Sequence, residues 1–226
     1  SIIGDILNKK KLNTSIKKIE PNIIFHLAAE PLVIDSYKNP EKTFNVNFIG
    51  TLNLLESVKN YNKKLKTLII VTTDKVYKIL ENNPNYNEKH CIGASDPYGT
   101  SKACVELLTE TYSKSFLKRK KINVFTARAG NVIGGGDFSK NRIVPDYLRS
   151  LNRSKKLIIR NPNHVRPWQY VLEPLYGYTV LVKKNYFYQR DFSSWNFSPI
   201  KSNSVKVKKL IATFQNSKNL KNKVRI

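Results

Sequence analysis

Short apolar runs alternate with helical segments over the first half of the chain. The clearest run is 68–72, a β-branched segment, and similar runs cover 22–29 and 123–127. Such runs are typical of strands buried on both faces of a parallel sheet. Between them, segments 40–60 and 98–118 repeat apolar residues at helical spacing. The order strand, helix, strand, helix, strand predicts an α/β fold with a Rossmann-like parallel sheet and helices on both faces.

The second half of the chain is less regular. It predicts a helix over 141–152, a short strand over 157–159 and a last amphipathic helix from Ser204. The region should form a smaller, irregular unit that could close over a ligand. Its regular structure is expected to be interrupted by prolines at positions 162, 167 and 174.

The chain is strongly basic, with 40 Lys and Arg against 16 Asp and Glu and a formal net charge of +24. This charge leaves a polyanion-binding protein as an alternative. However, the lysines are spread evenly along the sequence, which favours solvated surface charge over a nucleic-acid partner. Cys91 and Cys104 have neither metal-ligand spacing nor a disulfide-rich context. No run is long enough to span a membrane, and no signal peptide is recognisable, so we expect a cytoplasmic protein.

Tyr98 and Lys102 lie four residues apart at the start of a predicted helix, so both side chains should share one face of it. A tyrosine serves as a base only if its phenolate is stabilised, and a cationic lysine one turn away does this. A Tyr and a Lys at this spacing also occur by chance in many helices. The spacing alone is therefore weak evidence for a functional pair, and the functional interpretation depends on the neighbouring motifs.

Thr73, Asp74 and Lys75 follow the predicted strand 68–72 directly, at the end of the sheet where ligands bind in open α/β folds. They offer a hydroxyl, an acid and a base side by side. A turn or helix-capping cluster is the alternative interpretation. Together with Tyr98 and Lys102, the functional interpretation is favoured.

The remaining polar motifs are less specific. The three histidines, at positions 26, 90 and 164, lack mutual metal-ligand spacing, so we expect structural roles and no metal site. The glycines at 134–136 lack the strand-to-helix context of a phosphate loop and predict a flexible substrate loop. Arg142 and Arg166 are candidates for binding phosphate. Trp168 could stack on a ligand or fill the core.

The chain resembles the extended short-chain dehydrogenase/reductase family. Within it the resemblance is to the nucleotide-sugar 4,6-dehydratases, and most of all to the branch that acts on CDP-glucose. The motifs that carry it span nearly the whole chain: Gly4-Asp-Ile6, His26-Leu-Ala-Ala-Glu30, Asn47-Phe-Ile-Gly-Thr51, Val71-Thr-Thr-Asp-Lys75, Asp96-Pro-Tyr-Gly-Thr-Ser-Lys102, Ala127-Arg-Ala-Gly-Asn-Val-Ile-Gly-Gly-Gly-Asp137, Arg166-Pro-Trp-Gln169 and Trp195-Asn-Phe197.

The resemblance implies a lyase that oxidises the sugar at C4, eliminates water across C5 and C6, and returns the hydride to C6, with NAD as cofactor. In cells this would serve polysaccharide or O-antigen synthesis. Tyr98, supported by Lys102 and Thr73, would take the 4-hydroxyl proton. Asp74 would protonate the departing 6-hydroxyl, and Lys75 would be the C5 base. Many related dehydratases carry Glu at the position of Lys75, and the Lys form is associated with CDP-glucose.

The resemblance also implies the binding residues and divides the chain into a truncated NAD-binding domain (1–132) and a mostly substrate-binding region (133–226), parts of which return to the sheet. Asn47 matches a structural asparagine. The cofactor would contact Asp5, Ile6, Leu27, Ala28, Ala29, Tyr98 and Lys102. The nucleotide-sugar would contact Asn131, Arg142, Arg166 and Asn196.

Some family features are missing. The chain contains no methionine, and the Gly-rich turn that grips the pyrophosphate should precede Asp5, so we expect a fragment that is also cut at its C-terminal end. Gly99 and Thr100 are unusual within the Tyr98 motif. Segments 40–60 and 98–118 should form a homodimer interface. Alternatives are a dTDP-glucose or GDP-mannose dehydratase, an epimerase, and a non-catalytic polyanion-binding protein on a degenerate reductase scaffold.

Overall fold

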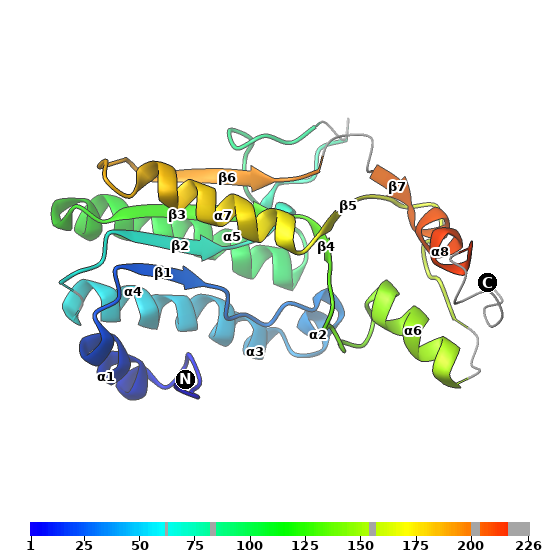
Figure 1. The fold of residues 1–226 in the computed structure, drawn as a ribbon, viewed down its shortest axis with the longest axis horizontal. Coiled ribbons are helices and arrows are strands. Elements are labelled where there is room, and N and C mark those ends of the chain that lie inside the picture. Colours follow the sequence, from blue (N-terminus) through cyan, green and yellow to red (C-terminus); the bar gives the residue numbers. More distant parts are fainter. Residues whose placement is uncertain (62, 82–84, 154–156, 200–203, 217–226) are drawn as a thin grey trace. The chain divides into compact units, whose positions relative to one another are not determined.

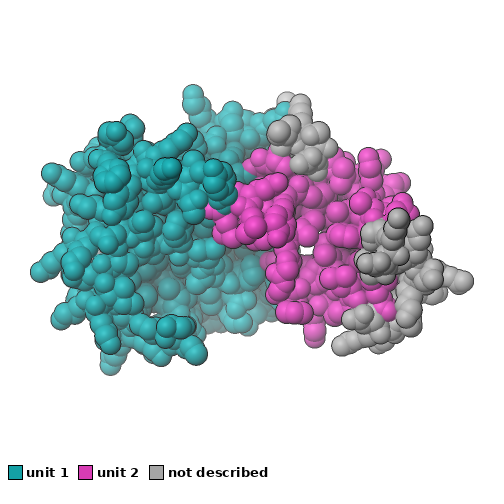
Figure 2. All heavy atoms as spheres, viewed as in Figure 1, with its two compact units in different colours: residues 1–129, 176–197 teal, residues 130–175, 198–226 magenta. Residues whose placement is uncertain are grey.

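The chain forms two compact units, coloured separately in Figure 2. Unit 1 comprises residues 1–129 and 176–197, and unit 2 comprises 130–175 and 198–226. The end of the predicted substrate-binding region, 217–226, lies outside the described residues. The computed structural model describes residues 1–61, 63–81, 85–153, 157–199 and 204–216.

The core of unit 1 is a parallel sheet of four strands in the order β1-β2-β3-β6 (Figure 1). The three strands predicted from the sequence are confirmed as β1, β2 and β3. The fourth strand, β6, comes from far later in the chain and was not predicted. The bounds are β1 Ile23–His26, β2 Thr67–Val71, β3 Asn123–Ala129 and β6 Ser193–Phe197.

Strand β2 is buried on both faces, as its apolar sequence predicts. Leu68 and Ile70 pack into one hydrophobic cluster, whereas Ile69 packs into another on the opposite face. Successive side chains of a strand point to opposite faces, so a strand between two helical layers is apolar throughout.

Helices cover both faces of the sheet of unit 1, which confirms the predicted fold class. Helices α1, α4 and α5 contribute to the cluster around Leu68 and Ile70, and α7 contributes Tyr178, Leu181 and Val182 to the cluster around Ile69. The helical bounds are α1 Lys9–Ile19, α2 Val33–Lys38, α3 Pro40–Phe44, the π-helix η1 Asn45–Ile49, α4 Gly50–Tyr61, the 3₁₀ turn η2 Asp74–Val76, α5 Pro97–Tyr112, the π-helix η3 Ser113–Leu117, the 3₁₀ turn η4 Lys118–Lys120, and α7 Leu172–Asn185.

Both predicted helices of the first half are confirmed with small changes. Segment 40–60 corresponds to α3, η1 and α4, and segment 98–118 corresponds to α5, η3 and the first residue of η4. Helices α1, α2 and α7 were not predicted. The lysine-rich α1 has a weak apolar signal, since Ile16 is its only buried residue, and its start is fixed by Asn8, whose side chain accepts a hydrogen bond from the Lys11 backbone N–H.

The described part of unit 2 contains a three-stranded mixed sheet, the helices α6 and α8, and the start of α7. Strand β5 pairs in parallel with β4 and antiparallel with β7. The helices α6 and α8 confirm the predicted helices at 141–152 and in the tail. Their buried Tyr147 and Ile211 form a small core with Leu151 and Leu157. The bounds are β4 Asn131–Ile133, α6 Ile143–Arg153, β5 Val165–Tyr170, β7 Ser204–Lys206 and α8 Val207–Asn216.

Two expectations for unit 2 are wrong. Residues 157–159 form no strand. Leu157 is buried against the core of unit 2, and Ile158 is exposed.

The prolines also do not interrupt the regular structure at two of the three expected positions. Pro167 lies within β5 and pairs with Ser204 of β7. Strand β4 pairs with β5 only from Trp168 onward, so the missing N–H of Pro167 removes no hydrogen bond between β5 and β4. Pro174 lies in the first turn of α7, where a backbone N–H has no helical partner.

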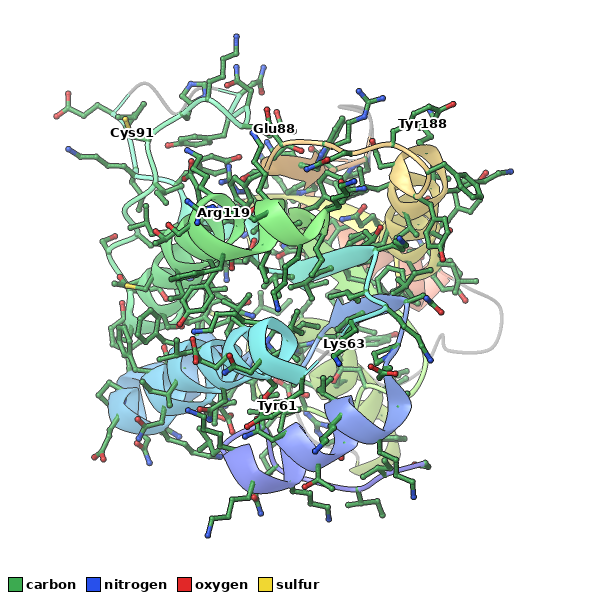
Figure 3. All side chains as sticks on the ribbon, turned by 90° about the vertical axis from the view of Figure 1, so that its left-hand side faces the viewer. Tyr61, Lys63, Glu88, Cys91, Arg119 and Tyr188 are labelled. Carbon is green, nitrogen blue, oxygen red and sulfur yellow. The ribbon has the colours of Figure 1, made fainter. Side chains whose placement is uncertain are left out.

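The basic residues of unit 1 are exposed on several separate elements. Figure 3 views the molecule from the end at which the strands of unit 1 begin, and Lys63 and Arg119 are labelled there. Both are exposed, and so are the lysines at the start of α1. This distribution fits the predicted solvated surface charge. In the described part of the chain, no helix combines the length and apolarity needed to cross a membrane.

Candidate active site

The end of strand β2 turns directly into the motif Thr73-Asp74-Lys75. Thr73 is extended and precedes the 3₁₀ turn η2. Its hydroxyl donates to Asp74 Oδ1 (3.2 Å) and accepts from the Lys75 backbone N–H (3.4 Å). The capping contact that the alternative interpretation expected is therefore present. It fixes the three residues at the carboxyl end of β2, where ligands bind in this class of sheet.

The first turn of α5 brings Tyr98 to the same place. Asp96 begins the helix by accepting a hydrogen bond from the Gly99 N–H (3.0 Å), and Pro97 occupies the first helical position. A Cβ atom on Gly99 would lie 2.8 Å from the Lys75 carbonyl oxygen and 2.6 Å from the Ala94 Cβ. Glycine is therefore required for this turn to approach Lys75 so closely.

The structure thus brings the two predicted motifs together. The Lys75 ammonium lies 5.9 Å from the centre of the Tyr98 ring, within range of a cation–π contact. Tyr98 and Lys102 are buried, Asp74 is partly buried and Lys75 is exposed. A substrate hydroxyl could therefore meet a phenol, a carboxyl group and an amine that all belong to unit 1.

Lys102 lies in a strongly desolvated environment. Its ammonium donates to the Val71 carbonyl (3.0 Å), at the end of β2. Burial lowers the pKa of Lys102 to about 8, although the Glu106 carboxylate opposes this shift. An ammonium has three donors, and the bond to Val71 is the only one it makes within the described parts of the chain. Two donors therefore remain for ligand hydroxyls, which fits a cofactor such as NAD.

His26 has the structural role expected from its apolar strand. Its Nε2 lies 2.9 Å from the Thr51 hydroxyl, which donates its single proton to the Asn47 carbonyl (2.6 Å). The Nε2 therefore carries a proton and donates it to Thr51. Burial, reinforced by the positive charge of Lys102, lowers the pKa of His26 to about 3. The imidazole is neutral at physiological pH.

The pKa of His26 predicts a loss of stability in acid. The unfolded chain binds the proton near pH 6.5, whereas the folded chain resists it until about pH 3. The free energy of unfolding should fall as the pH is lowered through this window, by roughly 5 kcal/mol from this group. Urea unfolding of the full-length protein at a series of pH values measures it. His26→Gln should flatten the curve, and His164→Gln, at an exposed site, should leave it unchanged. An equal slope in His26→Gln and the parent would contradict this assignment.

Asn47 links two segments that border the candidate site, as expected of a structural asparagine. Its amide exchanges two hydrogen bonds with the backbone of Glu30 (2.8 and 3.2 Å) and donates to the Ser101 hydroxyl (2.9 Å). Ser101 in turn donates to the Tyr98 carbonyl (2.7 Å). Asn47 therefore fixes the loop after β1 and the start of α5 relative to each other.

The residues predicted to contact the cofactor lie in three segments of unit 1. Asp5 folds back onto its own turn and accepts from the Leu7 N–H (2.8 Å). Ile6 contacts α4, where its carbonyl accepts from the Asn53 side chain (3.3 Å). The segment 27–29 follows β1, and Leu27 and Ala28 are exposed there. Tyr98 and Lys102 belong to the active-site cluster already described.

The residues predicted to hold the substrate are divided between the units. Asn131, Arg142 and Arg166 lie in unit 2. Arg142 forms an ion pair with Asp137 (3.1 Å), and Arg166 is exposed beside His164 (3.4 Å). Asn131 lies opposite Trp168 in the register of β4 and β5. Trp168 is partly buried and donates to the Val205 carbonyl (3.4 Å).

Asn196 lies in unit 1, and its side chain is used within that unit. It accepts a hydrogen bond from the Tyr77 hydroxyl (2.6 Å) and donates to the Tyr86 carbonyl (3.4 Å). Its backbone N–H donates to Glu88 (2.7 Å). Asn196 therefore fixes the loop that follows η2.

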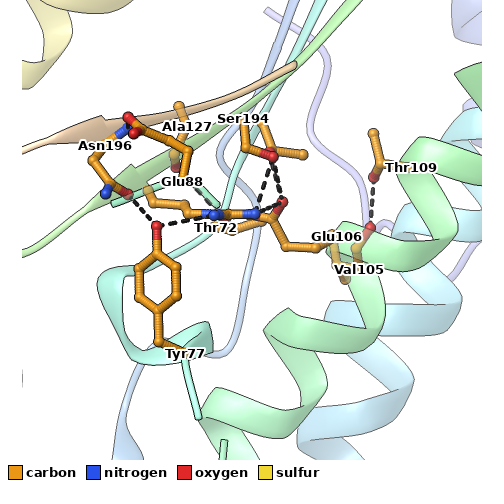
Figure 4. Close-up of polar contacts among 11 residues, drawn as sticks. Thr72, Tyr77, Glu88, Val105, Glu106, Thr109, Ala127, Ser194 and Asn196 are labelled. Atoms are coloured by element: carbon orange, nitrogen blue, oxygen red, sulfur yellow. Dashed lines mark hydrogen bonds and ion pairs between the residues drawn. The ribbon is translucent and has the colours of Figure 1, made fainter. Parts of the chain in front are cut away.

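Sequence reasoning missed a buried polar network next to the candidate motifs, built around Glu106 of α5 (Figure 4) and Arg128 of β3. A signal was present, because Arg128 interrupts a strand that is otherwise fully buried, and a buried charge needs a partner. Glu106, two turns after Tyr98 on the same helix, supplies it. Among the described residues, no three His, Cys, Asp or Glu side chains gather in a way that could hold a metal ion.

Comparison with known proteins agrees with this geometry. The family described as GDP-mannose 4,6 dehydratase matches residues 1–223. The chain is 44% identical to a CDP-glucose 4,6-dehydratase from Salmonella typhimurium, over 88% of the chain and 57% of that protein. It is 33% identical to a dTDP-D-glucose 4,6-dehydratase from Dictyostelium discoideum, over 80% of the chain and 43% of that protein. The chain thus spans about half the length of the curated relatives it matches.

A solved structure shows the same fold. A dTDP-glucose 4,6-dehydratase from Streptomyces venezuelae, solved with NAD bound, superimposes with a TM-score of 0.79 at 21% identity. The match covers 98% of this chain and 65% of that one.

Proposed function

The chain belongs to the family of nucleotide-sugar 4,6-dehydratases, and we propose that the full-length protein carrying it converts CDP-glucose to CDP-4-keto-6-deoxyglucose with NAD as cofactor. The observation that carries the proposal is the placement of Asp74 and Lys75 at the end of β2, beside Tyr98. An acid, a base and a phenol side by side are what C4 oxidation followed by elimination requires. The identity of 44% to a CDP-glucose dehydratase supports the choice of nucleotide.

In the first step Tyr98 takes the proton of the sugar 4-hydroxyl. Lys102, buried one helical turn away, stabilises the phenolate, and the Thr73 hydroxyl orients the substrate oxygen. NAD, held in part by Lys102, would supply the hydride acceptor for the oxidation at C4 and the hydride donor for the reduction at C6. The 4-keto group that results makes the C5 proton acidic.

In the second step the two residues after Thr73 eliminate water. Lys75, acting as a neutral amine, removes the C5 proton, and Asp74, in its protonated form, gives a proton to the departing 6-hydroxyl. The C6–O bond breaks and a C5–C6 double bond forms. After the hydride reaches C6, a proton returns to C5, so the net change is the loss of one water.

The described residues fit half of an NAD site. Lys102 has donors left for ribose hydroxyls, and the small residues Ala28 and Ala29 allow a flat ligand to approach the end of β1. Strand β1 lies at the edge of the sheet and leaves Ile23 and Phe25 exposed, and Leu27 directly after it is also exposed. Because apolar edge strands are normally covered, we expect a further strand with its Gly-rich turn to pair with β1 in the full-length protein.

Two further parts of the proposal concern substrate and partner. Asn131, Arg142, Arg166 and Asn196 are proposed to hold the nucleotide-sugar, with the guanidinium groups on phosphate oxygens. The helical segments 40–60 and 98–118 are proposed to form a homodimer interface. Exposed apolar side chains on these segments support it, namely Ile49, Leu107 and Phe116.

A substrate panel tests the function. The full-length protein is expected to convert CDP-glucose to a 4-keto-6-deoxy product at least tenfold faster than dTDP-glucose or GDP-mannose, measured as kcat/KM by mass spectrometry of the product. Preference for another nucleotide would correct the substrate and keep the chemistry. A 4-epimer without loss of water would favour an epimerase. No sugar product, together with salt-dependent nucleic-acid binding, would favour the polyanion-binding alternative.

A further inference from the structure

The segment 72–77, which carries the proposed acid and base, is attached at each end to one buried ion pair. The pair joins Arg128 of β3 to Glu106 of α5 through two hydrogen bonds of 3.0 and 2.9 Å. Both side chains are almost completely buried, with 5% and 2% exposed. Such a bidentate pair has a fixed geometry, so it can hold other groups in place.

The first attachment is at Thr72. Its hydroxyl donates to Glu106 Oε1 (2.5 Å), immediately before the catalytic motif begins. One residue earlier, the Val71 carbonyl accepts from Lys102. Lys102 and Glu106 lie one turn apart on α5, the helix that also carries Tyr98. Their side chains hydrogen-bond to the end of β2 at two successive residues, Val71 and Thr72.

The second attachment is at Tyr77. Its hydroxyl accepts from Arg128 (2.9 Å). It donates to Asn196 (2.6 Å), as Figure 4 shows. The Tyr77 ring stacks on Tyr86, with the ring centres 5.1 Å apart. Between the attachments, the Lys75 carbonyl rests against Gly99 of α5. The exposed Lys75 side chain therefore projects from a backbone that is fixed on both sides.

We propose that the Glu106–Arg128 pair, acting through Thr72 and Tyr77, is the positioning element that sets Asp74 and Lys75 against Tyr98. The inference rests on the proposed function. Tyr98 is held independently of Tyr77, because its carbonyl accepts from Ser101, which in turn accepts from Asn47, and Lys102 donates to the Val71 carbonyl. Loss of the Tyr77 attachment should therefore impair the elimination step and leave the C4 oxidation step largely intact.

Tyr77→Phe tests this in the full-length protein, because it removes one hydroxyl and keeps the ring that stacks on Tyr86. Elimination should slow about tenfold to a hundredfold relative to oxidation, as expected for a displaced catalytic group. In single-turnover reactions analysed by mass spectrometry, the 4-keto sugar that still has its 6-hydroxyl should accumulate. Exchange of the C5 proton with deuterated solvent should fall by the same factor.

Two controls separate positioning from general structural damage. Tyr147→Phe makes the same change at a buried tyrosine of unit 2 whose hydroxyl makes no hydrogen bond in the described structure, and it should alter neither step. At the other attachment, Thr72→Val should reproduce the accumulation, whereas Thr72→Ser, which keeps the hydroxyl, should restore elimination. If Tyr77→Phe does not fold, the comparison of Thr72→Val with Thr72→Ser tests the positioning role.

The outcomes are distinguishable. Equal slowing of both steps, or no accumulation in Tyr77→Phe and Thr72→Val, would overturn the positioning role while the dehydratase function stands. A parent protein that forms no 4-keto sugar from any nucleotide-hexose would overturn the function and the inference with it.

Discussion

Tyr98→Phe is expected to lower kcat of the full-length protein about a thousandfold, because the substitution removes the group that accepts the 4-hydroxyl proton. Tyr98 is buried at the start of α5. Phenylalanine fills the same volume, so the fold should persist. Both the 4-keto product and C5 exchange should disappear, since the C5 proton becomes acidic only after C4 is oxidised. Product formation by mass spectrometry and C5 deuterium incorporation measure the two effects.

Lys75→Ala provides the contrast. Its side chain is exposed, so little stability should be lost. C4 oxidation should continue, and C5 exchange and turnover should fall about a hundredfold or more. Unchanged C5 exchange in Lys75→Ala would remove Lys75 from the role of base. Residual turnover in Tyr98→Phe within a few-fold of the parent would remove Tyr98 from the role of proton acceptor.

The charge of Lys102 explains why the effect at Tyr98 should be large. A phenol with an ordinary pKa near 10 is protonated at neutral pH and needs a cation nearby to act as a base. Burial lowers the pKa of Lys102 to about 8, which keeps the ammonium mostly protonated at pH 7. The same burial removes water that would screen its charge, so its effect on a nearby phenolate is strengthened.

The sequence predicts β1, β2 and β3 because each contains an apolar run, although only β2 and β3 are buried along nearly their whole length. Strand β6 reads Ser-Ser-Trp-Asn-Phe, which mixes polar and apolar residues and contains no apolar run. Its position depends on pairing with β3, a contact between distant parts of the chain. The false strand at 157–159 has the opposite cause: its apolar residues pack onto helices of unit 2 without a partner strand.

The candidate site, like the fold, could be predicted from the sequence only in part. Tyr98, Lys102, Thr73, Asp74 and Lys75 form spaced motifs, and the strand-end rule predicts that they meet. The partner of Arg128 could not be predicted, because Glu106 and Glu110 both lie on the same helix within reach by sequence. Only the packing of α5 along the sheet decides that Glu106 meets Arg128, while Glu110 pairs with Lys114.

Glu106→Gln is expected to reduce the free energy of unfolding by about 3–5 kcal/mol, because it leaves the Arg128 guanidinium buried without a counter-charge. Although burial alone would lower the pKa of Arg128, its contacts with Glu106 and Tyr77 raise it overall, so the group stays charged. The glutamine also has one acceptor oxygen in place of two. Urea unfolding of the full-length protein measures the change.

Glu110→Gln is the matched control, since it makes the same substitution one helical turn later at a surface ion pair with Lys114. It should cost less than about 1 kcal/mol. Replacing both Glu106 and Arg128 by methionine should not recover the parent stability, unlike a simple buried pair. Glu106 also accepts from Thr72 (2.5 Å) and Thr126 (2.6 Å), and these buried hydroxyls would lose their acceptor. Equal losses in the two Gln variants, or full recovery in the double variant, would mean that the pair does not organise the network.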